Sequence, residues 1–251
     1  MGAGSGAARA SAAARARAGR GLDSFALKLL AIVAMTCNHA SYCFEAQLPF
    51  WGLTLLRGVG GLTFPIMAFL IVEGYHHTRS VRNYLLRLAL FAALAQVPYT
   101  VFLAPGEVQA NVLVTLFLGL LVVCLDDRLE NRALFAVVVL AILIAGIWCD
   151  WGVIGPAMIL LFKRLWHSRW REAPCLLPAA TDGLMGLALL LDGDPSGLSY
   201  ALYGMAACPL AIPLLRSYNG KRGPGFKYFF YAYYPGHIVA LGLIRLAVFG
   251  A

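Results

Sequence analysis

Charge is what this sequence lacks most. Of its 251 residues, 13% are charged and 61% are hydrophobic, whereas about a quarter of the residues of a soluble domain are charged. So few charged side chains cannot cover the water-facing surface of a globular protein of this length. The shortage excludes a soluble fold and predicts an all-α, polytopic transmembrane bundle that forms a single domain.

Acidic residues are scarcer than basic ones, 12 against 20, and the formal net charge is +8. A net positive charge of this size indicates nucleic-acid binding only where the basic side chains form one patch. Here clusters of Arg and Lys alternate with apolar runs, which is the pattern of membrane topology. We therefore expect the lipid bilayer as a partner, and no nucleic acid.

A disulfide framework and a clear metal site are also missing. All six cysteines lie in or beside apolar runs, where free cysteine is common and mostly inert. Cys37, His39 and Cys43 have a loosely metal-like spacing, and His39 and Cys43 share a helix face. Cys37 does not join that face, and no second ligand pair has a matching spacing. We expect no metal.

Residues 1–22 contain no acidic residue and consist mainly of Ala, Gly, Ser and Arg. Such a composition cannot form a core, so we expect a disordered basic tail, although it also imitates a transit peptide. The membrane domain then covers residues 23–251. Its first apolar run is long and ends without a signal-peptide cleavage pattern, so residues 25–44 are expected to remain as a helix.

Nine apolar segments follow one another along the chain. A bilayer core of about 30 Å requires about 20 helical residues, and several of the nine segments are shorter than this. The expected spans are 25–44, 55–75, 84–104, 111–125, 133–149, 151–165, 174–191, 198–215 and 228–249.

With nine spans, every basic loop falls on one side of the membrane. The N-terminal tail and the loops near Arg79, Arg128, Arg164 and Lys221 hold almost all of the Arg and Lys, while the other loops contain acids such as Glu45 and Asp192. The positive-inside rule makes the basic side cytoplasmic. The N-terminus is therefore expected inside and the C-terminus outside.

His39 lies in the outer half of the first expected span, within "AMTCNHASYC". An ionisable residue at this depth is costly, so a function is the first hypothesis. A neutral imidazole can take a proton from an amine or hydroxyl and later return it. The alternative is a structural histidine bonded to a backbone carbonyl.

Four other ionisable residues lie between the middle of the membrane and its outer side. Asp150 could orient His39 or bind an amine, and its alternative role is that of a helix cap or interfacial acid. Asp182 and His237 fall near mid-membrane, and Arg57 lies near the outer start of the second span. We take Arg57, Asp182 and His237 as candidates for substrate binding, and Asp150 with His39 as candidates for catalysis.

The second loop, "VEGYHHTRSVRNYLLRLAL", gathers Arg79, Arg82 and Arg87 at one cytoplasmic end. One guanidinium group can donate two parallel hydrogen bonds to two oxygens of a phosphate. For Arg79 and Arg82 alone, the positive-inside rule and contact with lipid headgroups are the better explanation. Arg87 differs because it lies a turn inside the membrane.

Four blocks resemble the TraX family of conjugative plasmids, which includes the F-pilin acetylase and TrbP-like proteins. The blocks cover the chain from about residue 23 to residue 249, and they are "LKLLAIVAMTCNHA", "GLTFPIMAFLIVEGYHHTRSVRNYLLRL", "CDWGVIGPAMILLF" and "KYFFYAYYPGH". More distantly, the first-span histidine followed by a "FLI" span and an Arg-rich turn is similar to the integral-membrane acyltransferases.

The resemblance implies that residues 23–251 form an acyltransferase-like domain in the inner, cytoplasmic membrane. It implies His39 as the essential histidine, and Arg79, Arg82 and Arg87 as contacts of acetyl-CoA. The implied activity is an acyl-CoA-dependent N-acetyltransferase that acetylates the N-terminus of a membrane-inserted pilin subunit during pilus biogenesis. Asn38 stands where the family often has an acid, which leaves Asp150 or Asp182 as the partner of His39.

Three other functions fit the same residues. A proton-coupled transporter could use His39, Asp150, Asp182 and His237 as a proton path, although the chain shows no internal repeat. A non-catalytic assembly factor would hold pilin in the membrane. An enzyme of the same kind could also use another acceptor, because the expected pocket walls are generic apolar residues.

Overall fold

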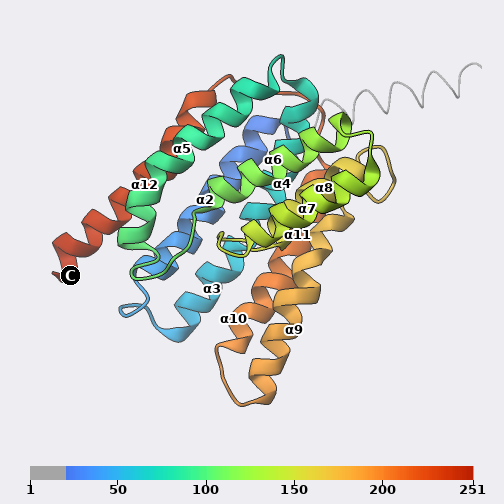
Figure 1. The fold of residues 1–251 in the computed structure, drawn as a ribbon. Coiled ribbons are helices and arrows are strands. Elements are labelled where there is room, and N and C mark those ends of the chain that lie inside the picture. Colours follow the sequence, from blue (N-terminus) through green and yellow to red (C-terminus); the bar gives the residue numbers. More distant parts are fainter. Residues whose placement is uncertain (1–20, 251) are drawn as a thin grey trace, which may run out of the picture.

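The computed structural model describes residues 21–250, and this part of the chain is helical and forms no strand. Residues 1–20 of the expected tail, and Ala251, lie outside the described residues. The elements, shown in Figure 1, are α2 (Ser24–Cys43), α3 (Phe50–Gly60), α4 (Thr63–His77), α5 (Val81–Phe102), α6 (Val112–Arg128), α7 (Arg132–Gly146), α8 (Ile154–Arg164), the 3-10 turn η1 (Ala173–Leu176), α9 (Leu177–Leu191), α10 (Gly197–Ala201), the π-helical turn η2 (Leu202–Ala207), α11 (Cys208–Arg216) and α12 (Lys227–Phe249).

Polar residues at the edges of the apolar segments begin the helices. The Asp23 carboxylate accepts a hydrogen bond from the backbone N–H of Ala26 at 2.8 Å and so caps α2. Ser80, Asn111 and Asn131 cap α5, α6 and α7 in the same way. A side-chain oxygen at this position satisfies an N–H that has no partner inside the helix. The edges of apolar segments therefore become helix starts.

Six helical segments are long and apolar enough to cross a bilayer, and they are Ser24–Cys43, Phe50–His77, Val81–Phe102, Ala173–Leu191, Gly197–Arg216 and Tyr228–Phe249. Helices α6, α7 and α8 have 17, 15 and 11 residues. At 1.5 Å per residue these helices are about 26, 22 and 16 Å long, less than the ~30 Å of a bilayer core. The membrane character is thus confirmed, while nine spans and a cytoplasmic N-terminus stay predictions.

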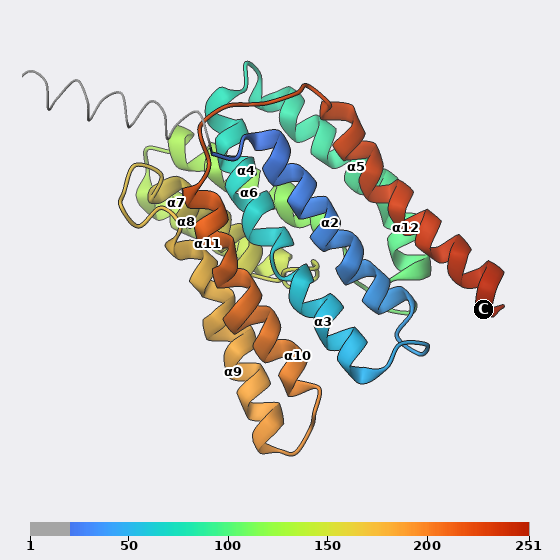
Figure 2. The same cartoon turned by 180° about the vertical axis from the view of Figure 1, so that it is seen from behind.

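The helix connections gather at two opposite ends of the bundle. We call one the basic end: it holds the α4–α5, α6–α7, α8–η1 and α11–α12 connections, which contain most of the loop Arg and Lys. The other is the acidic end, where α2–α3, α5–α6 and α9–α10 connect. Helices α9 and α10 extend furthest toward the acidic end. The α7–α8 connection does not reach this end and lies partway along the length of α9 (Figures 1 and 2).

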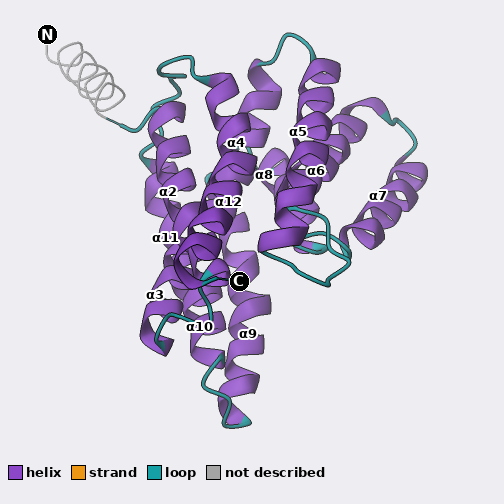
Figure 3. Cartoon of the chain, turned by 90° about the vertical axis from the view of Figure 1, so that its left-hand side faces the viewer, coloured by secondary structure: helices purple, strands orange, loops and turns teal. Residues whose placement is uncertain are grey.

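The side chains separate into a core and a lipid-facing surface. The core centres on fully buried side chains such as Phe64, Phe69 and Phe162. Helix α7 lies at one edge of the bundle in Figure 3, and α2 lies toward the opposite edge. On α5, large apolar side chains spaced three or four residues apart are 56–70% exposed, and they are Leu86, Leu90, Leu94, Val97 and Val101. This spacing places them on one helix face, which suits contact with lipid.

The apolar stretch Phe50–His77 is interrupted between α3 and α4. Pro65 lies in the first turn of α4 and has no N–H to donate to the Gly61 carbonyl four residues earlier. At Gly61 an added Cβ would lie 2.8 Å from the Tyr203 carbonyl oxygen in η2. Only glycine allows this approach. The break therefore brings α3 and η2 together toward the acidic end.

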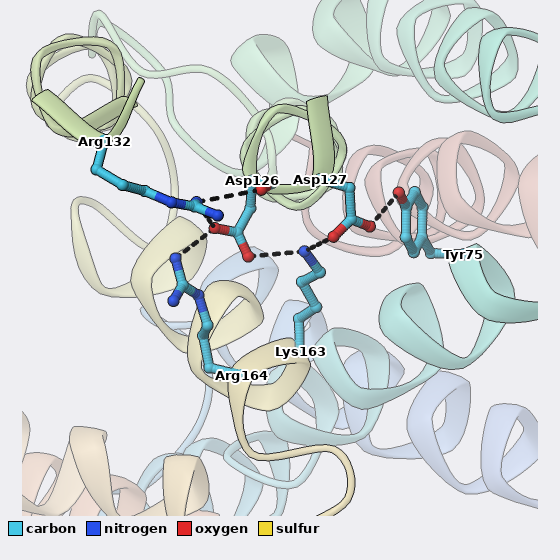
Figure 4. Close-up of polar contacts among 6 residues, drawn as sticks. All are labelled: Tyr75, Asp126, Asp127, Arg132, Lys163 and Arg164. Atoms are coloured by element: carbon cyan, nitrogen blue, oxygen red, sulfur yellow. Dashed lines mark hydrogen bonds and ion pairs between the residues drawn. The ribbon is translucent and has the colours of Figure 1, made fainter. Parts of the chain in front are cut away.

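An ion-pair network joins four helices at the basic end, and its members are Tyr75, Asp126, Asp127, Arg132, Lys163 and Arg164 (Figure 4). The Lys163 ammonium lies between two carboxylates, 2.7 Å from Asp126 Oδ2 and also bonded to Asp127. The side chains of Asp126 and Lys163 are only 6% and 10% exposed. The network fixes the short helices α6 and α8 against α4 and α7.

Candidate active site

A cavity of about 910 Å³ lies toward the acidic end. It is bounded by α2, α3, α5, the α5–α6 loop, the α7–α8 connection, α9, α10, η2 and α12. Its polar lining residues are Asn38, His39, Tyr42, Glu45, Arg57, Tyr99, Glu107, Gln109, Asp150, Asp182, Ser199, Tyr200, Tyr203 and Arg245. Residues from nearly the whole length of the chain thus meet around one space.

Carboxylates outnumber cationic side chains in this lining. Four acids face two arginines there: Glu45, Glu107, Asp150 and Asp182 face Arg57 and Arg245. One acid is neutralised locally, since Arg57 Nη2 donates to Glu45 Oε1 at 2.7 Å. The Arg57 guanidinium also lies 5.2 Å from the centre of the Tyr42 ring. The cavity is therefore acidic within a chain whose net charge is +8.

Asp150 lies in the connection between α7 and α8, where two backbone hydrogen bonds hold the chain. The N–H of Ala110 donates to the Trp148 carbonyl at 2.7 Å, and the N–H of Asp150 donates to the Ala110 carbonyl at 2.8 Å. Burial raises the pKa of the Asp150 carboxyl from 3.8 to about 6. Among the described residues its side chain has no hydrogen-bond or ion-pair partner, which leaves it available to a ligand.

The other acid in question, Asp182, lies on α9 and also lines the cavity. Its carboxylate likewise has no hydrogen-bond or ion-pair partner among residues 21–250. The structure thus brings Asp150 and Asp182 to the same space as His39. Neither acid is bonded to the imidazole, whose Nδ1 contacts another side chain.

That side chain is His237. His39 Nδ1 and His237 Nε2 are 2.7 Å apart, and His237 Nδ1 lies 2.8 Å from the Tyr233 carbonyl oxygen. The two imidazoles are 5% and 7% exposed. Only His39 lines the cavity. Helices α2 and α12, from opposite ends of the sequence, therefore build a histidine pair behind the cavity wall.

Asn38, the residue that stands where an acid was expected, lines the cavity beside His39. Its Oδ1 is buried and has no hydrogen-bond partner among the described residues. The side chain is pressed against α3, where a Cβ added to Gly60 would lie 2.5 Å from Oδ1. Asn38 thus offers an unused polar group next to the imidazole.

The three arginines of the second loop lie elsewhere, at the basic end. Arg79 and Arg82 are exposed, and Arg87 is half-buried with its guanidinium 5.7 Å from the centre of the Tyr84 ring. None of the three lines the cavity. The structure therefore places the candidate phosphate contacts and the candidate base at opposite ends of the bundle.

Sequence reasoning missed the tyrosines of the cavity, Tyr42, Tyr99, Tyr200 and Tyr203. A tyrosine at the end of a membrane helix is ordinarily an interfacial anchor. The residue type alone therefore did not indicate a place in the cavity. The pairing of His39 with His237 was missed as well. The "YYPGH" block pointed to His237, but no spacing connects residues 198 positions apart.

Fold and cavity together define a polytopic helical membrane protein with a buried histidine pair beside an acidic cavity. The chain belongs to the TraX family, because the family model described as "TraX protein" matches residues 24–245. That match covers all residues of the candidate site and the Arg-rich loop.

The chain is also similar to a protein of Dichelobacter nodosus described as "Probable fimbrial assembly protein FimC, serogroup H1". The two are 34% identical over 233 residues, which cover 87% of this chain and 93% of the relative. No solved structure matches the chain. The family and the relative make this a pilus-related membrane protein.

Proposed function

We propose that this protein is a membrane N-acetyltransferase that transfers an acetyl group from acetyl-CoA to the N-terminal amine of a pilin subunit. One observation carries the proposal: a buried imidazole, His39, lines an acidic cavity and has one nitrogen held by a second histidine. Membership of the TraX family and the similarity to a fimbrial assembly protein support a pilus component as acceptor.

The charge of the cavity suits an amine. Four carboxylates and two arginines leave a surplus of negative charge, which attracts an N-terminal ammonium. With a pKa of about 6, Asp150 is mostly ionised at pH 7, so it can bind the ammonium and lower the cost of burying it. Asp182 and Arg57, which line the same cavity, would position the rest of the acceptor.

The reaction is an acyl transfer in which His39 handles one proton. The bound ammonium first gives one proton to the Asp150 carboxylate. The free amine nitrogen then attacks the thioester carbon, and His39 Nε2 takes a second proton from that nitrogen. The C–N bond forms, the C–S bond breaks, and the sulfur leaves with its electron pair. The imidazolium then returns the proton to the sulfur, which yields the free thiol of CoA and the acetylated N-terminus. Holding both reactants in place would supply much of the rate.

The two substrates approach from opposite ends in this proposal. Arg79, Arg82 and Arg87 at the basic end would bind the phosphates of acetyl-CoA. The pilin subunit, itself in the membrane, would present its N-terminus at the acidic end. His39 lies in the last two turns of α2, on the acidic side. The site then belongs in the inner membrane, where cytoplasmic acetyl-CoA is available.

Intact-mass analysis of pilin tests the proposal. Pilin co-expressed with the wild-type protein is expected to gain the mass of one acetyl group, and His39→Ala should abolish that gain. His167→Ala is the matched control, because His167 is exposed at the basic end and does not line the cavity. Equal pilin masses with the wild type and with His39→Ala would refute the proposal.

A non-catalytic assembly factor is the second candidate, favoured by the description of the Dichelobacter nodosus relative. The two candidates differ in what His39→Ala does. For an assembly factor, pilin acetylation would not depend on this protein, and its His39→Ala variant would keep normal pilin levels and filament numbers. A transfer assay in vitro with radiolabelled acetyl-CoA and purified protein distinguishes the acetyltransferase from the assembly factor.

A further inference from the structure

We infer that His237 is a positioning residue that holds His39 in the one neutral tautomer able to act as a base toward the cavity. The inference rests on the proposed function for its consequence in catalysis. It begins with a contact between α2 and α12: His39 Nδ1 and His237 Nε2 are 2.7 Å apart, which is a short hydrogen bond between nitrogens.

The two rings meet edge to edge. Their planes are inclined by 10° and their centroids are 4.9 Å apart. Rings stacked face to face are kept about 3.5 Å apart by van der Waals contact, and the two nitrogens are closer than that. The N–H of one ring therefore lies close to the plane of the other and points at its lone pair.

The direction of this hydrogen bond follows from the next contact. His237 Nδ1 lies 2.8 Å from the Tyr233 carbonyl oxygen, and a carbonyl oxygen can only accept. His237 must therefore carry its proton on Nδ1. A neutral imidazole has one N–H and one lone pair, so His237 Nε2 is the acceptor.

The same reasoning then assigns His39. Since His237 Nε2 accepts, His39 Nδ1 carries the proton and donates it. The lone pair of His39 is left on Nε2. His39 lines the cavity and makes no other hydrogen bond among the described residues, so Nε2 is the nitrogen available to a substrate. The opposite tautomers would set a lone pair of His237 against the Tyr233 oxygen.

The frame around His237 is fixed by a second contact between the same helices. The Thr36 hydroxyl donates to the Ile32 carbonyl at 2.7 Å, so its oxygen accepts from the Tyr233 hydroxyl, also at 2.7 Å. The Tyr233 ring stacks on His237 at a centroid distance of 5.1 Å. Helix α2 therefore anchors the residue that both covers His237 and supplies its carbonyl acceptor.

Two amide variants separate positioning from packing. In His237→Gln the amide oxygen can reach the place of Nε2 and accept from His39. In His237→Asn the shorter amide can still bond to the Tyr233 carbonyl but does not reach His39. Both keep a polar group of similar size. We expect kcat to fall within about tenfold for Gln and by about 10²-fold for Asn, the lower end of what general-base catalysis contributes.

The KM for pilin should change little in both variants, because His237 does not line the cavity. An independent readout is ¹⁵N NMR of the purified, histidine-labelled protein. The chain has five histidines, and the spectrum of His39→Ala identifies the His39 signals. In the wild type and His237→Gln we expect a proton on Nδ1 and none on Nε2. In His237→Asn we expect a mixture of tautomers.

The outcomes can be told apart. A wild-type kcat together with an unchanged His39 tautomer in His237→Asn would overturn the inference, as would equal losses of kcat in both variants with the tautomer unchanged. If the wild-type protein transfers no acetyl group, the proposed function fails. The NMR result still decides whether His237 sets the His39 tautomer.

Discussion

The ionisable residues of the cavity differ in what holds them. His39 is bonded to His237, and His237 to a backbone carbonyl, so both imidazoles are fixed. Asp150 and Asp182 have no such partners among the described residues, and their carboxylates remain available. A base needs a fixed direction, whereas a group that attracts an ammonium needs an unsatisfied charge. The difference in contacts matches the roles we propose.

Asp150 should make the stability of the protein depend on pH. Its pKa is raised from 3.8 to about 6, so between these values the folded state binds more protons than the unfolded state. Stability must then fall as pH rises through this window. Asp150→Asn removes that cost. We expect a higher Tm than the wild type at pH 7, by about 2–4 °C for each kcal/mol removed, and no difference near pH 4.

Thermal unfolding of the detergent-purified protein at several pH values measures this effect. Asp192→Asn is the matched control, since Asp192 is an exposed residue after α9. A Tm difference between wild type and Asp150→Asn that is the same at pH 4 and pH 7 would contradict the prediction.

Residue type alone identified His39, Asp150, Asp182 and His237 as candidates, because an ionisable group in an apolar helix is rare and costly. Their contacts could not be predicted in the same way. His39 and His237 meet only because α2 and α12 pack side by side, and neither residue carries a local signal for the other. The acid expected to partner His39 is replaced by a histidine from the far end of the chain.

At the level of single elements, two short helices create the room for the site. Helices α7 and α8 stop partway along α9, and their connection lines the cavity with Asp150 and its neighbours (Figure 2). Non-helical backbone at membrane depth is tolerated where it lines a cavity. Backbone bonds between this connection and Ala110 satisfy part of its polar groups. The short length of these helices thus has a structural consequence.

The ion-pair network of Figure 4 should matter most where it is buried. Lys163→Met keeps the apolar stem but leaves Asp126, only 6% exposed, without one of its partners. We expect a loss of about 1–3 kcal/mol of stability, typical of hydrogen bonds to charged groups. Arg132→Ala removes a 65% exposed partner of the same carboxylate, and exposed pairs contribute about 0–1 kcal/mol.

The comparison between these two variants is made by thermal unfolding in detergent, with acetyl transfer as a second readout. Both side chains contact Asp126, and they differ in the burial of the cation and in the additional bond of Lys163 to Asp127. Equal losses of stability in Lys163→Met and Arg132→Ala would show that burial does not govern the strength of this network.

At the scale of the whole molecule, the two ends carry different chemistry. The basic end holds the Arg-rich connections and the ion-pair network, and the acidic end holds the cavity with its surplus of carboxylates. A membrane between these ends would separate an acyl donor from an amine acceptor. The proposed reaction requires this separation, with the basic end in the cytoplasm.

Single cysteines test this orientation. Val108 is 88% exposed in the α5–α6 loop, so Val108→Cys should react with a membrane-impermeant maleimide added to intact spheroplasts. Asn83→Cys, exposed at the basic end, should react only after permeabilisation. The wild type is the control for the native cysteines, five of which are buried. Labelling in the reverse pattern would invert the proposed orientation and separate the arginines from cytoplasmic acetyl-CoA.

The amino-acid sequence alone predicted the class of protein, its apolar helical segments and the candidate site residues. These features depend on local properties: apolar length and the cost of an ionisable group in a helix. The packing of the helices, in contrast, determines which of the candidate residues meet. The histidine pair, the acidic cavity and the distance of the arginines from it arise from how helices distant in the chain pack, and neither spacing nor composition records that packing.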